Sequence, residues 1–313
     1  MLQEIEVTEI DDLLEADKKF VELHSVLNAM NVLFGELQCL ELDFKDDQIF
    51  KPSLERCQYI LDSLHDHPKA IAMVEKMPES ERLIMDNVLA ALAQYPDKVD
   101  CPEVQMSIDN LRSVFSILEV RVRELIDRWQ YPDRWIELGI EQLKNDFLNF
   151  FTALEKNSKG RYRIIYNLAA QSANDYFVTF NTESPTDKTI TIPPSFQDVM
   201  RDLMANARKY TPWGGQIAIG LLDDGENLKF VVKDTGRGIP TEELAIVANM
   251  GVRGSNVKNI RSMGNGIGLT KAFLVTKRYG GRMWIGSDGQ HGTRIKIIIP
   301  NQQFLLAHKS LVS

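Results

Sequence analysis

The segment KDTGRGIP, residues 233–240, carries a strong candidate for ligand chemistry. It follows the apolar run LKFVV, so that a predicted strand ends close to an acid, Asp234. Gly236 and Gly238 allow positive φ angles or the close approach of a ligand to the backbone. We therefore expect Asp234 to face a flat, hydrogen-bonding ligand from the end of a buried strand. An exposed acid in a tight strand-to-helix turn is the alternative.

A second group of polar residues lies in PPSFQDVMRDLMANARKYT, residues 193–211, which is predicted to be a helix. Asp202, Asn206 and Lys209 are spaced by four and three residues, so they share one side of that helix. An acid, an amide and an ammonium together suit a metal-bound polyphosphate, whereas a solvated helix edge is the alternative.

A glycine run lies in MGNGIGLTKAF, residues 263–273, where Gly264, Gly266 and Gly268 open another predicted helix. Bare backbone amides at a helix N-terminus attract phosphate. The preceding NVKNIRS is a poor strand and no GxxxxGK[ST] sequence occurs, which argues against a dinucleotide fingerprint or a phosphate loop.

Basic residues lie between the two glycine-rich motifs. The segment VANMGVRGSNVKNIRSM contains Arg253, Lys258 and Arg261 among glycines. This composition suits a mobile lid that closes over phosphates, and a basic solvated loop is the alternative.

The elements that must position these residues fall into two halves. Up to about residue 170, apolar residues recur at helical spacing, and residues 13–42 predict a helix of about 40 Å. Beyond that point YFVTFN, KTITI, QIAIGLL, LKFVVK, RMWIGS and TRIKIII each suit a strand, with helical stretches between them. In the helix that carries Asn206, Ser195 is the expected N-cap, with Asp198 three residues on. We predict an α+β protein with a helical bundle in residues 1–170 and an α/β domain in residues 171–313.

Composition limits the class of protein. The net charge of −8 argues against nucleic acid as a partner. The cysteines, Cys39, Cys57 and Cys101, have no metal-like spacing, and a reduced, cytoplasmic compartment is expected. No apolar run is long enough for a membrane span, and the acidic N-terminus is unlike a signal peptide.

The order of these motifs resembles the ATP-binding domain of histidine kinases, a branch of the ATPases that include gyrase, mismatch-repair and chaperone members. The resemblance covers about residues 175–300 and implies an α/β sandwich with a mixed sheet that binds ATP and Mg²⁺. It implies that Asn206 is a magnesium ligand, Lys209 a phosphate contact and Tyr210 a neighbour of adenine. Asp234 matches the acid that accepts from the adenine amine, and Thr293 the threonine that supports it.

The resemblance also implies nucleotide contacts from the glycine-rich motifs and the lid. These contacts are Gly236, Gly238, Arg253, Gly264, Gly266, Gly268 and Leu269. Asp202 stands where many members have a glutamate, which implies a catalytic role as base or polariser for the accepting histidine. The phenylalanines of many kinase lids are absent here.

A phosphate acceptor is expected on the long N-terminal helix. LHSVLNAMNVLFGEL resembles the family's dimerisation helix, with His24 followed by Asn28 and Gly35, although Ser25 replaces the usual acid. The resemblance implies that His24 is phosphorylated, and we expect its ring on an exposed helix face. A helical insertion at about residues 96–170 would explain the long separation from Asn206.

The other histidines are weaker candidates, because they fall in predicted loops, in a turn or in the tail. They are His65, His67, His291 and His308. The apolar stripe of the long helix, which includes Leu23, Leu27, Met30 and Leu37, predicts a homodimer, with burial inside a single-chain bundle as the alternative.

We therefore predict a cytoplasmic, ATP-dependent protein histidine kinase of a two-component system. It would autophosphorylate and pass the phosphoryl group to the receiver domain of a response regulator. Two alternatives stay open at this point: a degenerate ATP-binding scaffold without phosphotransfer, and a protein serine kinase of the dehydrogenase-kinase type.

Overall fold

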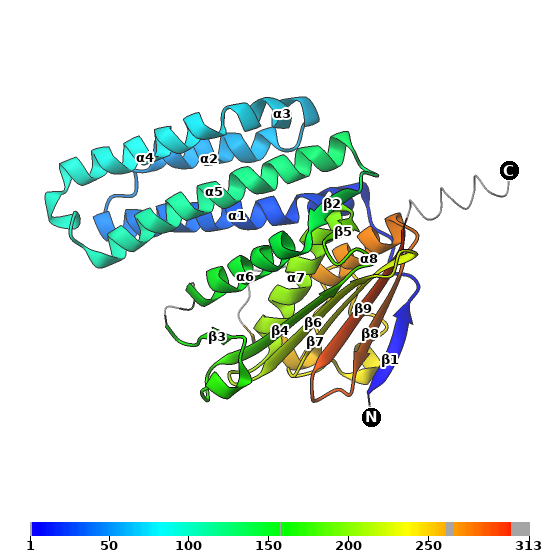
Figure 1. Cartoon of the computed structure of the whole chain (residues 1–313). Coiled ribbons are helices and arrows are strands. Elements are labelled where there is room, and N and C mark those ends of the chain that lie inside the picture. Colours follow the sequence, from blue (N-terminus) through cyan, green and yellow to red (C-terminus); the bar gives the residue numbers. More distant parts are fainter. Residues whose placement is uncertain (1, 157, 159, 261–265, 302–313) are drawn as a thin grey trace. The chain divides into compact units, whose positions relative to one another are not determined.

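The computed structural model describes residues 2–156, 158, 160–260 and 266–301, and it divides the chain into two compact units (Figure 1). One unit is Leu14–Pro132, and the other combines Met1–Leu13 with Asp133–Ser313. The predicted boundary near residue 170 differs from this division. From the sequence, helix α6 (Ile140–Lys156) was expected to belong to the helical bundle. In the structure its residues Leu143, Phe147 and Phe151 lie in the core of the sheet-containing unit.

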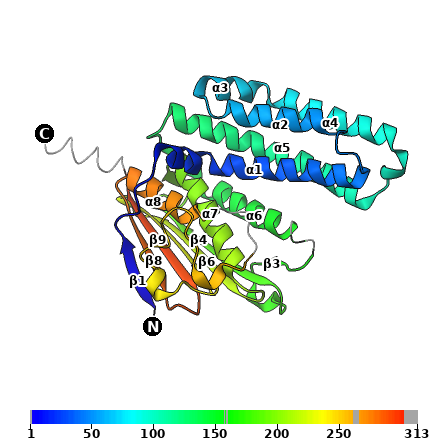
Figure 2. The ribbon, with the colours of Figure 1, turned by 180° about the vertical axis from the view of Figure 1, so that it is seen from behind.

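The helical unit contains α1 (Glu15–Phe44), α2 (Lys51–Ser63), α3 (His67–Glu75), α4 (Met77–Gln94), a 3₁₀ turn (Pro96–Lys98) and α5 (Pro102–Gln130). A proline lies in the first turn of each helix from α2 to α5, where its missing N–H costs no helical hydrogen bond. Helix α1 lies alongside α5 in both views, and α2 contacts α4 (Figures 1 and 2). The long helix predicted at residues 13–42 is confirmed.

The apolar stripe of α1 is buried by helices of the same chain. Leu23, Met30 and Leu37 are at most 1% exposed and belong to one core with residues of α2, α3, α4 and α5. The stripe therefore needs no second chain to cover it. This burial removes the reason for expecting a homodimer through this stripe. The structure contains the alternative, a bundle formed by a single chain.

The second unit is built on a mixed sheet in the order β1-β8-β9-β7-β6-β4-β3. Its strands are β1 (Gln3–Val7), β3 (Ile164–Ile165), β4 (Tyr176–Glu183), β6 (Gln216–Asp223), β7 (Asn227–Asp234), β8 (Arg282–Ser287) and β9 (Thr293–Pro300). The pairs β3–β4 and β4–β6 are parallel, and the other neighbours are antiparallel. A separate ribbon pairs β2 (Ile136–Gly139) with β5 (Thr189–Ile192).

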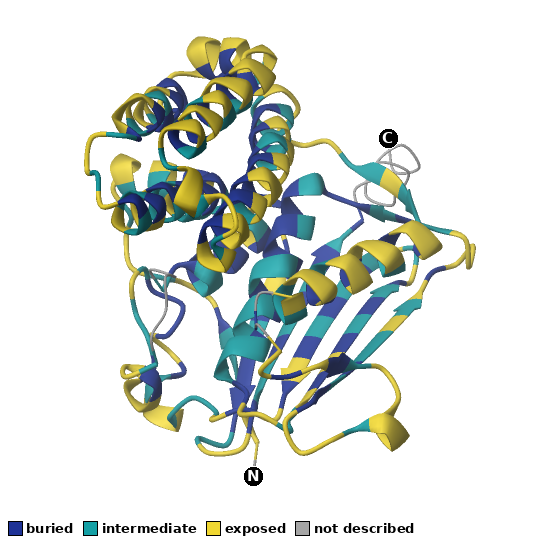
Figure 3. Ribbon diagram, turned by 90° about the vertical axis from the view of Figure 1, so that its left-hand side faces the viewer, coloured by how far each residue is buried: buried dark blue, intermediate teal, exposed yellow. Residues whose placement is uncertain are grey.

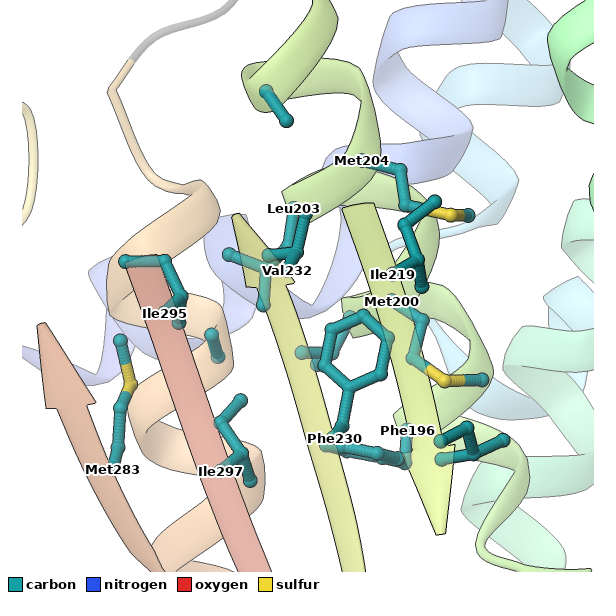
Figure 4. Packing of buried hydrophobic residues seen from close by; sticks show 14 of the residues in the cluster. Phe196, Met200, Leu203, Met204, Ile219, Phe230, Val232, Met283, Ile295 and Ile297 are labelled. Carbon is teal, nitrogen blue, oxygen red and sulfur yellow. The ribbon is translucent and has the colours of Figure 1, made fainter. Parts of the chain in front are cut away.

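Helices α6, α7 (Pro194–Tyr210) and α8 (Gly268–Arg278) complete this unit. Burial alternates along β6, β7 and β9, so each strand turns one face to the helices (Figure 3). Figure 4 shows Phe196, Met200 and Leu203 of α7 directed at sheet residues, which are Ile219, Phe230, Val232, Ile295 and Ile297. The predicted fold class, a helical bundle followed by an α/β sandwich with a mixed sheet, is confirmed.

Candidate nucleotide site

Asp234 is the last residue of β7, and the alternation of that strand explains its position. Leu228, Phe230 and Val232 are buried, and the same face places Asp234 inside, at 8% exposure. The carboxylate therefore lies at the edge of the apolar layer between sheet and helices, as expected from the sequence.

The two oxygens of Asp234 have different surroundings. Oδ1 accepts hydrogen bonds from the backbone N–H of Gly236 at 2.8 Å and of Thr293 at 3.2 Å. Within the described ranges no donor contacts Oδ2. One oxygen is thus fixed by the protein while the other is available to a donor on a ligand. Thr293 supports the acid through its backbone N–H, at the first residue of β9.

Burial raises the pKa of Asp234 to about 6, and the two backbone hydrogen bonds oppose this shift. The carboxyl therefore changes its charge near pH 6. In its ionised form Oδ2 can only accept a hydrogen bond, whereas protonation would make the group a donor as well.

We expect ATP affinity to fall as the pH drops through 6. A ligand that donates to Oδ2 binds the ionised form, so its apparent affinity should decrease roughly tenfold between pH 7 and pH 5. Calorimetric titration over pH 5 to 8 measures this dependence. Because phosphate groups also titrate near pH 6, the control is Asp234→Asn, which should lack the part due to the carboxyl. The same slope in both proteins would contradict the assignment.

The glycines of the turn make room for the protein's own backbone. A Cβ on Gly236 would lie 2.6 Å from Asp234 Oδ1 and 2.7 Å from the Tyr210 carbonyl oxygen. Gly238, at φ +67°, packs against the β8–β9 hairpin, where a Cβ would come within 2.8 Å of Gln290 N. The structure thus gives both glycines a packing role, and their contact with the ligand ring stays a prediction.

Two residues missed by the sequence interpretation hold this turn in place. The buried Ser287 hydroxyl donates to the Gly292 carbonyl at 2.9 Å and accepts from the Ile239 N–H at 2.9 Å. Gly292 has φ +91°, and a Cβ there would lie 2.1 Å from the Asp234 carbonyl oxygen. In the sequence Gly292 is marked only by the turn GQHG, residues 289–292, and Ser287 has no local signal.

The polar stripe of α7 faces the start of α8. A Cβ on Gly268 would lie 2.9 Å from Asn206 Nδ2 and 4.0 Å from Asp202 Cβ. The structure thus brings the glycine-rich helix N-terminus, Asn206 and Asp202 together, as predicted. Lys209 lies at the C-terminal end of α7, with Nζ 4.8 Å from the centre of the Tyr210 ring.

A buried lysine also contacts this stripe, and it was not predicted. Lys271 of α8 donates to Asp202 Oδ2 at 2.9 Å and forms an ion pair with Asp198.

The predicted N-cap is wrong, because Pro193 occupies the N-cap position and the Ser195 hydroxyl lies 3.2 Å from the Tyr279 hydroxyl. Asp198 binds a cation from the neighbouring helix, which a reading of local helix signals does not reveal.

The predicted lid is only partly described. Arg253 donates through Nη2 to the carbonyls of Val257 and Ile260, at 3.1 and 2.9 Å, and thereby joins parts of the lid segment. Gly266 has φ +72° and packs on the Gly251 backbone, and Leu269 follows in the first turn of α8. Gly264 and Arg261 lie outside the described residues.

The N-terminal segment of the chain belongs to this unit. Strand β1 pairs antiparallel with β8, with Ile5 opposite Ile285. Asp11 and Asn249 then form two hydrogen bonds, in which Asn249 Nδ2 donates at 2.7 Å and Asp11 N donates at 3.1 Å. The N-terminus thus supports the sheet edge and the first residues of the lid segment.

His24, the predicted acceptor, lies in the helical unit. It is 7% exposed, and its Nε2 is 3.1 Å from the Asn28 side-chain nitrogen. The expectation of an exposed ring is wrong in this structure. Phosphorylation at His24 would first require the ring to become accessible.

The remaining histidines differ in their surroundings. His67 is exposed and begins α3, with its ring stacked on Trp129 at 3.9 Å. The exposed His291 lies 3.2 Å from Asp288 in the β8–β9 turn. His308 lies outside the described residues.

A metal would need ligands from the nucleotide. Among the described residues no three His, Cys, Asp or Glu side chains form a group that could hold an ion. The Asn206 amide and the Asp202 carboxylate offer oxygens on one helix face, which fits Mg²⁺ when phosphate oxygens and water complete its shell.

In the part of the chain that the structure describes, no helix is both long and apolar enough to cross a bilayer.

Comparison with known proteins finds similarity over part of the chain. Residues 191–303 match the family described as histidine kinase-, DNA gyrase B-, and HSP90-like ATPase. The adaptive-response sensory kinase SasA of Synechococcus elongatus is 30% identical over 115 residues, which cover 36% of this chain and 29% of SasA. The sensor histidine kinase WalK of Bacillus subtilis is 30% identical over 107 residues, which cover 34% of this chain and 18% of WalK.

The chain thus aligns with less than a third of the length of these two relatives. Among solved structures, the catalytic domain of histidine kinase ThkA is 17% identical, with a TM-score of 0.38 over 53% of this chain and 97% of that chain.

Proposed function

We propose that this chain, whose residues 191–303 form an ATP-binding domain of the histidine kinase type, is an ATP-dependent protein histidine kinase of a two-component system. The observation that carries the proposal is the buried Asp234 carboxylate, with Oδ1 fixed by two amides and Oδ2 left to a ligand. An adenine amine is a donor that suits such an oxygen. Two-component signalling implies a response-regulator receiver domain as partner and, from the composition, a cytoplasmic setting.

The nucleotide would lie between the turn at Asp234 and the start of α8. Gly268 and Leu269 would offer backbone amides to the phosphates, and Asn206 would contribute an amide oxygen to the metal. Mg²⁺, when bound, supplies neutralisation of phosphate charge. Lys209 and Arg253 are proposed as further cationic contacts, although Nη2 of Arg253 already binds two carbonyls.

His24 is the proposed acceptor of the phosphoryl group. An imidazole with an unprotonated nitrogen is a nucleophile, and Nε2 in this structure accepts from the Asn28 amide. Asp202 is the proposed acid that would assist the acceptor. The burial of His24 favours a second candidate function, an ATP-binding signalling module that transfers no phosphate.

Incubation of the full chain with radiolabelled ATP and Mg²⁺ tests the two candidates. Histidine phosphorylation gives label that is lost in acid and kept in alkali, and site mapping identifies the residue. Label that survives acid would contradict histidine transfer and favour a serine kinase. Bound ATP without any label would favour the signalling module.

Asn206→Ala is expected to weaken Mg²⁺-ATP about tenfold, or 1.4 kcal/mol, while metal-free ATP loses less than about twofold. The reason is that the amide oxygen of Asn206 would act through the metal. Calorimetry with Mg²⁺ and with a chelator measures both affinities. Equal losses would show that Asn206 is structural.

A further inference from the structure

A buried cluster of charges joins α7 to α8 beside the proposed phosphate position. The Lys271 ammonium pairs with Asp198 and lies 2.9 Å from Asp202 Oδ2. The Lys271 side chain is 6% exposed and that of Asp198 is 1% exposed, whereas that of Asp202 is 21% exposed. The cluster therefore has an enclosed end at Asp198 and a more open end at Asp202.

Stability alone gives little reason for this arrangement. The desolvation of buried charges offsets much of their attraction, and well-packed apolar side chains of similar volume are often at least as stabilising. Arg201 is a further cation near the enclosed end, with Nη2 3.5 Å from Asp198 Oδ1. The open end differs because, among the described residues, Asp202 is paired with one cation, Lys271.

The open end of the cluster lies at the proposed nucleotide site. Asp202 precedes Asn206 by one helical turn, and both side chains lie against Gly268 at the start of α8. Lys271 follows Gly268 by three residues, so it reaches Asp202 from the helix whose amides would bind phosphate. An unpaired carboxylate here would repel the negative charges of a polyphosphate.

We propose that Lys271 is a positioning residue that holds Asp202 beside Asn206 and compensates the charge that Asp202 would present to the phosphates. The proposal rests on the nucleotide function proposed above. Lys271 contacts the carboxylate through Oδ2, and no described donor contacts Oδ1. Oδ1 of Asp202 thus remains for water or metal, while the Lys271 ammonium at Oδ2 compensates the charge of the carboxylate.

If Lys271 compensates the charge of Asp202, the loss of affinity on its removal should depend on the number of phosphates in the nucleotide. Lys271→Met should weaken metal-free ATP about fivefold, ADP less, and AMP less than about twofold, since repulsion grows with phosphate charge. A loss of structure at this site would weaken all three nucleotides alike. Calorimetry of the full chain with a chelator, at one pH and ionic strength, gives the three affinities.

Removal of the opposite charge should reverse the effect. In Lys271→Met/Asp202→Asn, one positive and one negative charge are lost together, so ATP affinity should return to within about twofold of wild type. Lys271→Arg keeps the charge and should also stay within about twofold. If Lys271→Met does not fold by circular dichroism, Lys271→Gln replaces it, because glutamine keeps a donor for the carboxylates without the charge.

Lys277→Met is the matched control. It makes the same substitution two turns later on α8, at an exposed lysine whose Nζ lies 5.5 Å from the centre of the Phe273 ring. All three affinities should stay within about twofold of wild type.

The proposal is overturned by equal losses for ATP and AMP, by no loss for ATP, or by no recovery in the double variant. It is also overturned, together with the proposed function, if wild type binds none of the three nucleotides. If the nucleotide series behaves as expected while the wild-type chain takes up no label from ATP, the kinase proposal fails and the role of Lys271 stands.

Discussion

Asp234→Asn is expected to weaken ATP binding by about tenfold to a hundredfold, or about 1.5 to 3 kcal/mol. The asparagine oxygen can still accept from Gly236 and Thr293, so the turn should keep its fold. The amide nitrogen then takes the place of Oδ2 and directs a donor at the adenine amine, which is itself a donor. Calorimetric titration with Mg²⁺-ATP measures the change.

Asp223→Asn is a matched control for this experiment. Asp223 is also buried, at 7% exposure, also ends a strand, and also accepts from the N–H of a glycine two residues on, Gly225, at 2.9 Å. It lies at the opposite end of the β6–β7 hairpin, because Asp223 pairs with Leu228 and Asp234 with Ile217. Its ATP affinity should stay within about twofold of wild type. Unchanged binding by Asp234→Asn, or equal losses in the two variants, would refute the adenine assignment.

His24→Gln is expected to abolish phosphorylation and leave ATP affinity unchanged. Glutamine has a similar reach and can bond to Asn28, but it has no ring nitrogen that could attack the γ-phosphorus. Because His24 is buried, labelling of the wild-type chain should be slow. The label should be acid-labile and alkali-stable, and a time course with radiolabelled ATP measures its rate.

His67→Gln is the control within the same unit. His67 is exposed and stacks on Trp129, so its replacement should leave the labelling rate within about twofold. Equal labelling of wild type and His24→Gln would refute the assignment of His24 as the phosphoryl acceptor. Loss of label in His67→Gln alone would move the acceptor to the start of α3.

The expectations that rested on local pattern agree with the structure. Asp234 lies buried at the end of its strand, because the period of two along β7 places it on the same side as Leu228 and Phe230. The spacing of Asp202 and Asn206 places both against Gly268, because residues four apart share a helix face. The ordered motifs were sufficient to indicate an ATP-binding domain of the histidine kinase type.

The interpretation of the helical half was less accurate. Helix α6 has the same apolar spacing whether it packs on helices or on a sheet, so the pattern could not place Phe147 in the sheet-containing unit. The stripe at Leu23 and Met30 requires burial but does not say by which chain. A helix likewise exposes or buries His24 according to what packs on it, and the single histidine gives no local signal.

By itself, the sequence determined the strand and helix periods, the acid at the end of β7 and the glycines that its turn requires. These features depend on neighbours within about one turn or one strand. Tertiary structure decided the rest: Ile5 pairs with Ile285 at the far end of the chain, and Lys271 reaches Asp202 from another helix. The physical reason is that backbone pairing at a sheet edge and the pairing of buried charges depend on distance in space, which spacing along the chain does not encode.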